Sequence, residues 1–100
     1  MFCVLYEFKI KPGCESEFRK FWREVTAESV KKDGSLGARL HASEEGGFIA
    51  YAQWKDRKSW ESGHKDIERR SMEINIDDLL LEIPTVLRHM QSLDDLLVED

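Results

Sequence analysis

The sequence is poor in cysteine and in proline, with two of each among its 100 residues. Cys3 and Cys14 lack the paired spacing of a zinc-binding motif, and two cysteines are too few to build a disulfide framework. Both are therefore expected to be reduced thiols. The three histidines, His41, His64 and His89, are scattered along the chain, and this spacing does not indicate a metal site. No metal is predicted.

Positive charge and long apolar runs are also scarce. Fifteen Lys and Arg residues stand against 20 Asp and Glu, for a formal net charge of -5, which disfavours a nucleic-acid partner because such partners are held mainly by phosphate neutralisation. No apolar run approaches the roughly 20 residues of a membrane-spanning helix. Residues 1–10 also lack the basic start and the cleavage site of a signal peptide. We therefore expect a cytoplasmic protein with no membrane partner, folded as one domain over residues 1–100.

Alternation of apolar residues with other residues is what the sequence does contain, and it is typical of strands. It occurs in three stretches, residues 2–10, 36–42 and 48–54. Glu45-Gly46-Gly47 lies between the last two and favours a hairpin turn, so these strands are expected to pair antiparallel. In the third stretch two alanines stand between Phe48 and Trp54. Such small side chains predict a space above the sheet, which a helix must fill or a ligand can occupy.

Two further stretches have the spacing of amphipathic helices. Residues 15–32 begin with acidic and end with basic side chains, which matches the helix dipole, and Asp33-Gly34 follows as a stop signal. Later in the chain, Asp56 favours a helix start, and Gly63 indicates a break. The segments predicted around these signals are a short helix over 57–62, a longer helix over about 65–83 that Pro84 ends, a strand over 85–92 and an acidic tail over 93–100.

The order strand, helix, strand, strand, helix, strand predicts an α+β fold. With right-handed crossovers it gives a ferredoxin-like βαββαβ sandwich, in which a four-stranded antiparallel sheet carries both helices on one face. The other face is too apolar for solvent, so we expect a homodimer that closes an α+β barrel through it, with Glu7 paired to Arg39 of the other subunit. The residues expected on that face are Leu5, Glu7, Arg39, His41, Ile49, Tyr51, Gln53, Leu87 and His89.

The stretch from Tyr51 to His64 is the most specific part of the sequence. A strand ends in Tyr51-Ala-Gln-Trp54, Lys55-Asp56 follows, and the next helix carries Trp60 and then His64. With Lys11-Pro12-Gly13 after the first strand, this pattern resembles the antibiotic biosynthesis monooxygenase family of dimeric α+β barrels. The resemblance implies a cofactor-independent monooxygenase that acts on a small conjugated or aromatic molecule, with molecular oxygen as co-substrate.

The resemblance also implies a site between the sheet and the helices. Trp54 matches the tryptophan of the polyketide-oxidising branch and is expected to act as substrate wall and hydrogen-bond donor. His64 is the residue expected to handle protons. The expected pocket lining is Tyr6, Trp22, Ala50 and Trp60. Two positions differ from that branch, because Ala50 stands where it has an asparagine and Trp60 where it has a tyrosine.

Haem is not expected as a cofactor. The haem-degrading branch of the family would need an asparagine near the middle of the first strand and an axial histidine inside the second helix. Here the strand carries Glu7, and residues 68–76 contain no histidine.

Two other interpretations remain open at this point. Trp54 and His64 can be purely structural, one as core and the other as a histidine bonded to backbone at a helix terminus. The protein is then a non-catalytic dimeric module that binds a small apolar ligand, or a structural module with a filled interior. An open cavity with a polar group in its wall would distinguish an enzyme from both.

Overall fold

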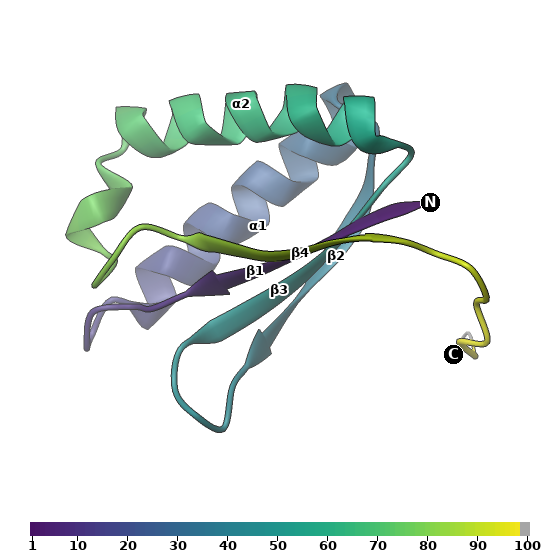
Figure 1. Ribbon diagram of the computed structural model, residues 1–100. Helices are drawn as coiled ribbons and strands as arrows, with labels where there is room; N and C mark the ends of the chain where they lie inside the picture. Colours follow the sequence, from purple (N-terminus) through teal and green to yellow (C-terminus); the bar gives the residue numbers. More distant parts are fainter. Residues whose placement is uncertain (99–100) are drawn as a thin grey trace.

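A computed structural model describes residues 1–98 and places two helices on one face of a four-stranded sheet, leaving the other face uncovered (Figure 1). The strands lie in the order β2-β3-β1-β4, and every neighbouring pair is antiparallel. The predicted ferredoxin-like α+β fold is therefore confirmed. The elements are β1 (Phe2–Phe8), α1 (Glu15–Lys32), β2 (Ser35–Ala42), β3 (Phe48–Trp54), α2 (Arg57–Glu73), the 3-10 helix η1 (Ile76–Asp78) and β4 (Thr85–Gln91).

Helix α1 has the bounds that its sequence pattern predicts. Its acidic first turn and basic last turn complement the helix dipole, and Gly34 follows in a left-handed conformation with φ of 75°. Phe18, Val25 and Ser29 form its buried stripe. This stripe faces the sheet and forms one wall of the space between the layers.

Helix α2 runs through Gly63 without a break, so the break predicted there is wrong. Asp56 caps the helix as expected, since its side chain accepts a hydrogen bond from the Ser59 backbone N–H at 2.8 Å. Gly63 allows the helix to pack closely against Trp54 and does not terminate it. A Cβ built on it would lie 2.5 Å from both Cη2 and Cζ3 of Trp54, closer than real side chains approach.

The end of α2 also differs from the prediction, because the helix stops at Glu73 and not near Ile83. Asn75 adopts a left-handed conformation with φ of 55°, which asparagine tolerates better than most residues and which terminates the helix. The apolar pattern beyond it reflects burial and not a continuous helix. Ile76 and Leu80 pack against Phe18 in a core cluster.

An irregularity in β4 changes which face its side chains occupy. The β1–β4 register shifts between Leu5 and Tyr6, which places His89 opposite Val4 on the helix side of the sheet. The prediction that His89 lies on the uncovered face is therefore wrong. Its ring instead lies 4.6 Å from that of Trp60, centroid to centroid, in an edge-on contact.

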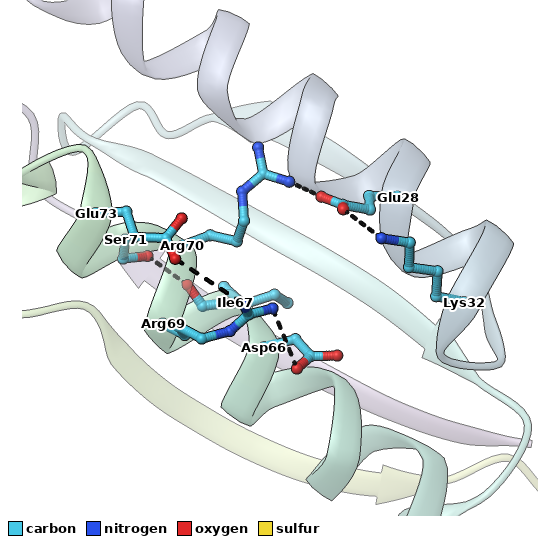
Figure 2. Close-up of polar contacts among 8 residues, drawn as sticks. All are labelled: Glu28, Lys32, Asp66, Ile67, Arg69, Arg70, Ser71 and Glu73. Carbon is cyan, nitrogen blue, oxygen red and sulfur yellow. Dashed lines mark hydrogen bonds and ion pairs between the residues drawn. The ribbon is translucent and has the colours of Figure 1, made fainter.

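One ion pair joins the two helices, and others lie within each helix beside it (Figure 2). Arg70 of α2 pairs with Glu28 of α1, and Glu28 also accepts a hydrogen bond from Lys32 at 2.9 Å. Within α2, Arg69 lies 3.7 Å from Asp66 and 3.9 Å from Glu73. The pairs within one helix are exposed and contribute little each, whereas the Arg70–Glu28 pair fixes one helix against the other.

The core is divided into two clusters. One joins β1 and β3 to the start of α2 and contains Phe2, Val4, Ala52, Trp54 and Trp60. The other joins α1 to the segment after α2 and contains Phe18, Ile76 and Leu80. Members of both clusters line a cavity between the sheet and the helices.

Candidate active site

The cavity has a volume of about 390 Å³, which lies within the usual range of small-molecule pockets. Every layer contributes to its wall: Tyr6 from β1, Trp22 from α1, Ala50 and Trp54 from β3, and His64 from α2. They are five of the six residues for which the sequence predicts a role at the site. The structure brings them together, and their roles in binding and catalysis stay predictions.

The floor of the cavity is formed by small residues of the sheet. Ala50 is 1% exposed and Ala52 is 6% exposed, yet neither side chain extends far above the strands. Ala38 of β2 also contributes to the lining. The space predicted from the two alanines between Phe48 and Trp54 is thus present, and α1 and α2 do not fill it.

Two buried nitrogen atoms in the cavity's lining residues have no hydrogen-bond partner. They are Trp54 Nε1 and His64 Nδ1, and they are the only buried side-chain N or O atoms in the described part of the chain without one. An unsatisfied buried polar group costs about 1–3 kcal/mol. A ligand that reached both atoms, with an acceptor for the indole N–H and a hydroxyl for the imidazole, would remove this cost.

The orientation of His64 is fixed by its neighbours. Its Nε2 lies 2.9 Å from Glu68 Oε1, one helical turn further along α2. Its ring stacks on Trp60 at a centroid distance of 5.1 Å and on Tyr6 at 6.2 Å. In the neutral imidazole, the contact with Glu68 holds the proton on Nε2 and leaves the lone pair on Nδ1. His64 is thus arranged to accept a proton at Nδ1.

Tyr6 is a neutral phenol in this site. Burial raises the pKa of Tyr6 to about 12, while the hydrogen bond from Trp60 acts in the opposite direction. Trp60 Nε1 donates that bond to Tyr6 Oη at 2.7 Å. Trp60 itself is not among the lining residues, so the expectation that it lines the pocket differs from the structure. Trp60 lies outside the lining, where it donates a hydrogen bond to Tyr6 and stacks on the ring of His64.

Sequence reasoning missed Glu68, which lines the cavity and contacts His64. The i, i+4 spacing of the two residues on one helix was an available signal. The helix break expected at Gly63 obscured it. Met72 and Ile83 were also missed as lining residues, since they lie where the helix was expected to continue.

Neither a metal centre nor a membrane span is found in the described residues. Residues 1–98 contain no group of three His, Cys, Asp or Glu side chains placed to hold a metal ion. None of the helices in this part of the chain combines the length and the apolar character needed to cross a bilayer.

A comparison against protein families identifies the family of the chain. The family model described as antibiotic biosynthesis monooxygenase matches residues 1–65, from the first strand to just beyond His64. The chain belongs to this family. The match covers Tyr6, Trp54, Trp60 and His64, whereas Glu68 lies outside it.

Solved structures of similar proteins extend the likeness to nearly the whole chain. Rv0793 of Mycobacterium tuberculosis has a TM-score of 0.75 and 17% identity, covering 95% of this chain and 97% of its own. PA3566 of Pseudomonas aeruginosa has a TM-score of 0.72 and 19% identity over 93% and 94%. A monooxygenase of Streptomyces coelicolor, solved with the ligand nanaomycin D, has a TM-score of 0.72 and 20% identity over 98% and 92%. At these identities the likeness shows the fold alone. A search of curated proteins gives no match.

Proposed function

We propose that this protein is a cofactor-independent monooxygenase that oxidises a small conjugated or aromatic molecule bound in the cavity. One observation carries the proposal. The two unpaired buried nitrogens belong to Trp54 and His64, and both residues line the same mainly apolar cavity. One nitrogen is a donor suited to a developing phenolate, and the other is an acceptor suited to a proton. Membership of the antibiotic biosynthesis monooxygenase family supports the reaction class.

The reaction proposed for this site converts a ring methylene beside a phenol or ketone into a carbonyl. His64 Nδ1 takes a proton from the methylene, and the indole N–H of Trp54 stabilises the negative charge that spreads to the substrate oxygen. The carbanion adds molecular oxygen, and the peroxide takes the proton back from His64. Loss of water then leaves the ketone, so that CH2 and O2 become C=O and H2O. The substrate supplies all the electrons, and no cofactor or haem is required.

Tyr6 and Glu68 support these steps in the proposal. The phenol of Tyr6, neutral because of its raised pKa, can donate a hydrogen bond to the substrate. Glu68 holds the imidazole in the tautomer that has its lone pair on Nδ1. The apolar wall formed by Trp22 and Ala50 limits access of water to the carbanion.

A non-catalytic ligand-binding module is the alternative, and one observation favours it. Ala50 contributes no polar group to the floor of the cavity, where the polyketide-oxidising branch of the family has an asparagine. A module of this kind would bind the same class of molecule without oxidising it.

A homodimer is part of the proposal. Leu5, Ile49 and Tyr51 lie on the sheet face that carries no helix, and they are only half-buried in the single chain. A second copy placed on this face would bury them and close the barrel.

Oxygen uptake with dihydroxyanthrone, a phenol with a reactive ring methylene, tests the proposed function. We expect uptake above the rate in buffer, with formation of the anthraquinone, and a loss of at least about tenfold in His64→Gln. The matched control is His41→Gln, which removes an imidazole from the opposite face of the sheet and is expected to keep the activity. Binding of the compound without any uptake above buffer would favour the binding module instead.

A further inference from the structure

The lining of the cavity carries no positive side chain of its own. Its ionisable side chains are Tyr6, His64 and Glu68, and none of the described residues that form the lining is Lys or Arg. Tyr6 is neutral below pH values near its raised pKa of about 12. The charge that a ligand meets is therefore set by His64 and Glu68.

Glu68 cancels the one positive charge that the cavity can acquire. Its Oε1 lies 2.9 Å from His64 Nε2, so a protonated imidazole is paired with a carboxylate as soon as it forms. A neutral imidazole leaves the pair with the negative charge of Glu68. In neither state does the pair offer a net positive charge to an anionic ligand.

The described residues that line the mouth of the cavity are apolar. Met72 and Ile83 line the cavity, although they are 73% and 81% exposed, so they lie where the cavity meets solvent. Glu82 is the chain neighbour of Ile83 and pairs with Lys9 at 3.1 Å. Lys9 beside this segment thus already has a carboxylate partner.

We propose that Glu68 is a specificity-determining residue that makes the cavity select uncharged apolar ligands and reject anionic ones. The ligand class is a neutral conjugated molecule without a carboxylate, phosphate or sulfate group. This inference deepens the proposed function, because it describes the molecule that the same cavity takes. The physical reason is that an anion moved from water into an apolar cavity loses its hydration and here gains no opposite charge in return.

Two probes of similar size and shape, one neutral and one anionic, test the inference. Acetylnaphthalene and naphthoate share the same ring system, and a methyl group in the first replaces a carboxylate oxygen in the second. Isothermal titration calorimetry at neutral pH gives both dissociation constants without any turnover. We expect the wild-type protein to bind the neutral probe at least about tenfold more tightly.

The variant Glu68→Gln keeps the size of the side chain and removes its charge. We expect the preference for the neutral probe to shrink by at least about threefold, mainly through tighter binding of naphthoate. Glu73→Gln is the matched control, because it removes a carboxylate from the same helix at a residue that does not line the cavity. It should keep the wild-type preference.

The outcomes separate this inference from the proposed function. Neutral selectivity that depends on Glu68 supports the inference even if dihydroxyanthrone is not oxidised, since binding is measured without oxygenation. Equal or tighter binding of naphthoate by the wild-type protein would overturn it, as would full selectivity in Glu68→Gln. Failure of both probes to bind would also overturn it, because the cavity would then not be a site for neutral conjugated molecules.

Discussion

The indole ring of Trp54 occupies the space that Gly63 leaves on the inner side of α2. A Cβ at Gly63 would lie 2.5 Å from two carbon atoms of that ring, so the glycine is what allows the helix to cross the tryptophan at this distance. Trp54 is 2% exposed and lines the cavity. Stability and site geometry therefore depend on the same contact.

Gly63→Ala should destabilise the protein, although alanine is the better helix former. The gain in helix propensity is about 1 kcal/mol, whereas overpacking against a rigid ring costs about 1–3 kcal/mol, so we expect a net loss in the free energy of unfolding. Urea denaturation measures it. Ser62→Ala, at the exposed neighbouring position, is the control and should not lower stability. The cost of Gly63→Ala should fall when Trp54→Phe is combined with it, and an unchanged cost would contradict the contact.

Alkaline pH should destabilise the protein through Tyr6. The phenol ionises near its ordinary pKa of about 10 in the unfolded chain, whereas burial raises its pKa to about 12 in the fold. Between these values the unfolded state has released the proton and the folded state has kept it, so stability falls as pH rises. The contribution lost is about 2–3 kcal/mol by pH 12.

Tyr6→Phe tests this pH dependence. Because Tyr51 also has a raised pKa, mainly through its hydrogen bond with Cys3, the wild-type protein and the variant must be compared over the same pH range. Denaturant midpoints between about pH 9 and pH 12 should fall less steeply in Tyr6→Phe. Parallel curves would show that Tyr6 ionises as freely in the fold as in the unfolded chain.

Asp33→Asn should stabilise the protein slightly near neutral pH. Burial, and to a smaller extent the neighbouring Asp66, raises the pKa of Asp33, so the fold disfavours its charged form. The free energy of unfolding therefore decreases as pH rises and Asp33 becomes charged. Asparagine keeps the shape without the charge. At this half-buried position the gain should be at most about 1 kcal/mol, and it should vanish in acid, where Asp33 is protonated. Thermal melts at both pH values measure the gain, and Asp77→Asn is the control.

The proposed dimer predicts that Ile49→Glu yields a monomer. Ile49 pairs with Glu7 and His41 in the sheet register, and its side chain is half-buried on the uncovered face. A charge there would be buried without a partner in the dimer. Sedimentation velocity should show a dimer for the wild-type protein and for Val30→Glu, a control on α1 at a side chain that is 49% exposed. A wild-type monomer would refute the dimer.

Local signals in the sequence predicted most of the fold. Alternation identified three of the four strands, and the charges and the Asp33-Gly34 stop gave α1 its bounds, because both signals depend on neighbours in the chain. The continuation of α2 through Gly63 could not be predicted in this way, because the glycine is explained by its contact with Trp54 on β3. The register shift that turns His89 toward Trp60 likewise depends on pairing between β1 and β4. Of the predicted tail over 93–100, the last two residues lie outside the described part of the chain.

The sequence predicted most of the residues of the candidate site but not how they are arranged. Trp54, His64 and Tyr6 were predicted from alternation and resemblance, and they line one cavity. Glu68 was hidden by the expected helix break. Trp60 lies behind Tyr6 because of a hydrogen bond between the two side chains, and the spacing of residues in the sequence does not predict such a bond.

The NMR signal of the Trp54 indole N–H, assigned through Trp54→Phe, shows whether this nitrogen binds a ligand in the cavity. The probe is dihydroxyanthraquinone, a stable product analogue with carbonyl acceptors and phenol donors. We expect the Trp54 signal to move downfield as the probe saturates the cavity, because its unpaired N–H gains an acceptor. The Trp60 signal, already bonded to Tyr6, should move much less. Binding of the probe with an unchanged Trp54 signal would contradict the account.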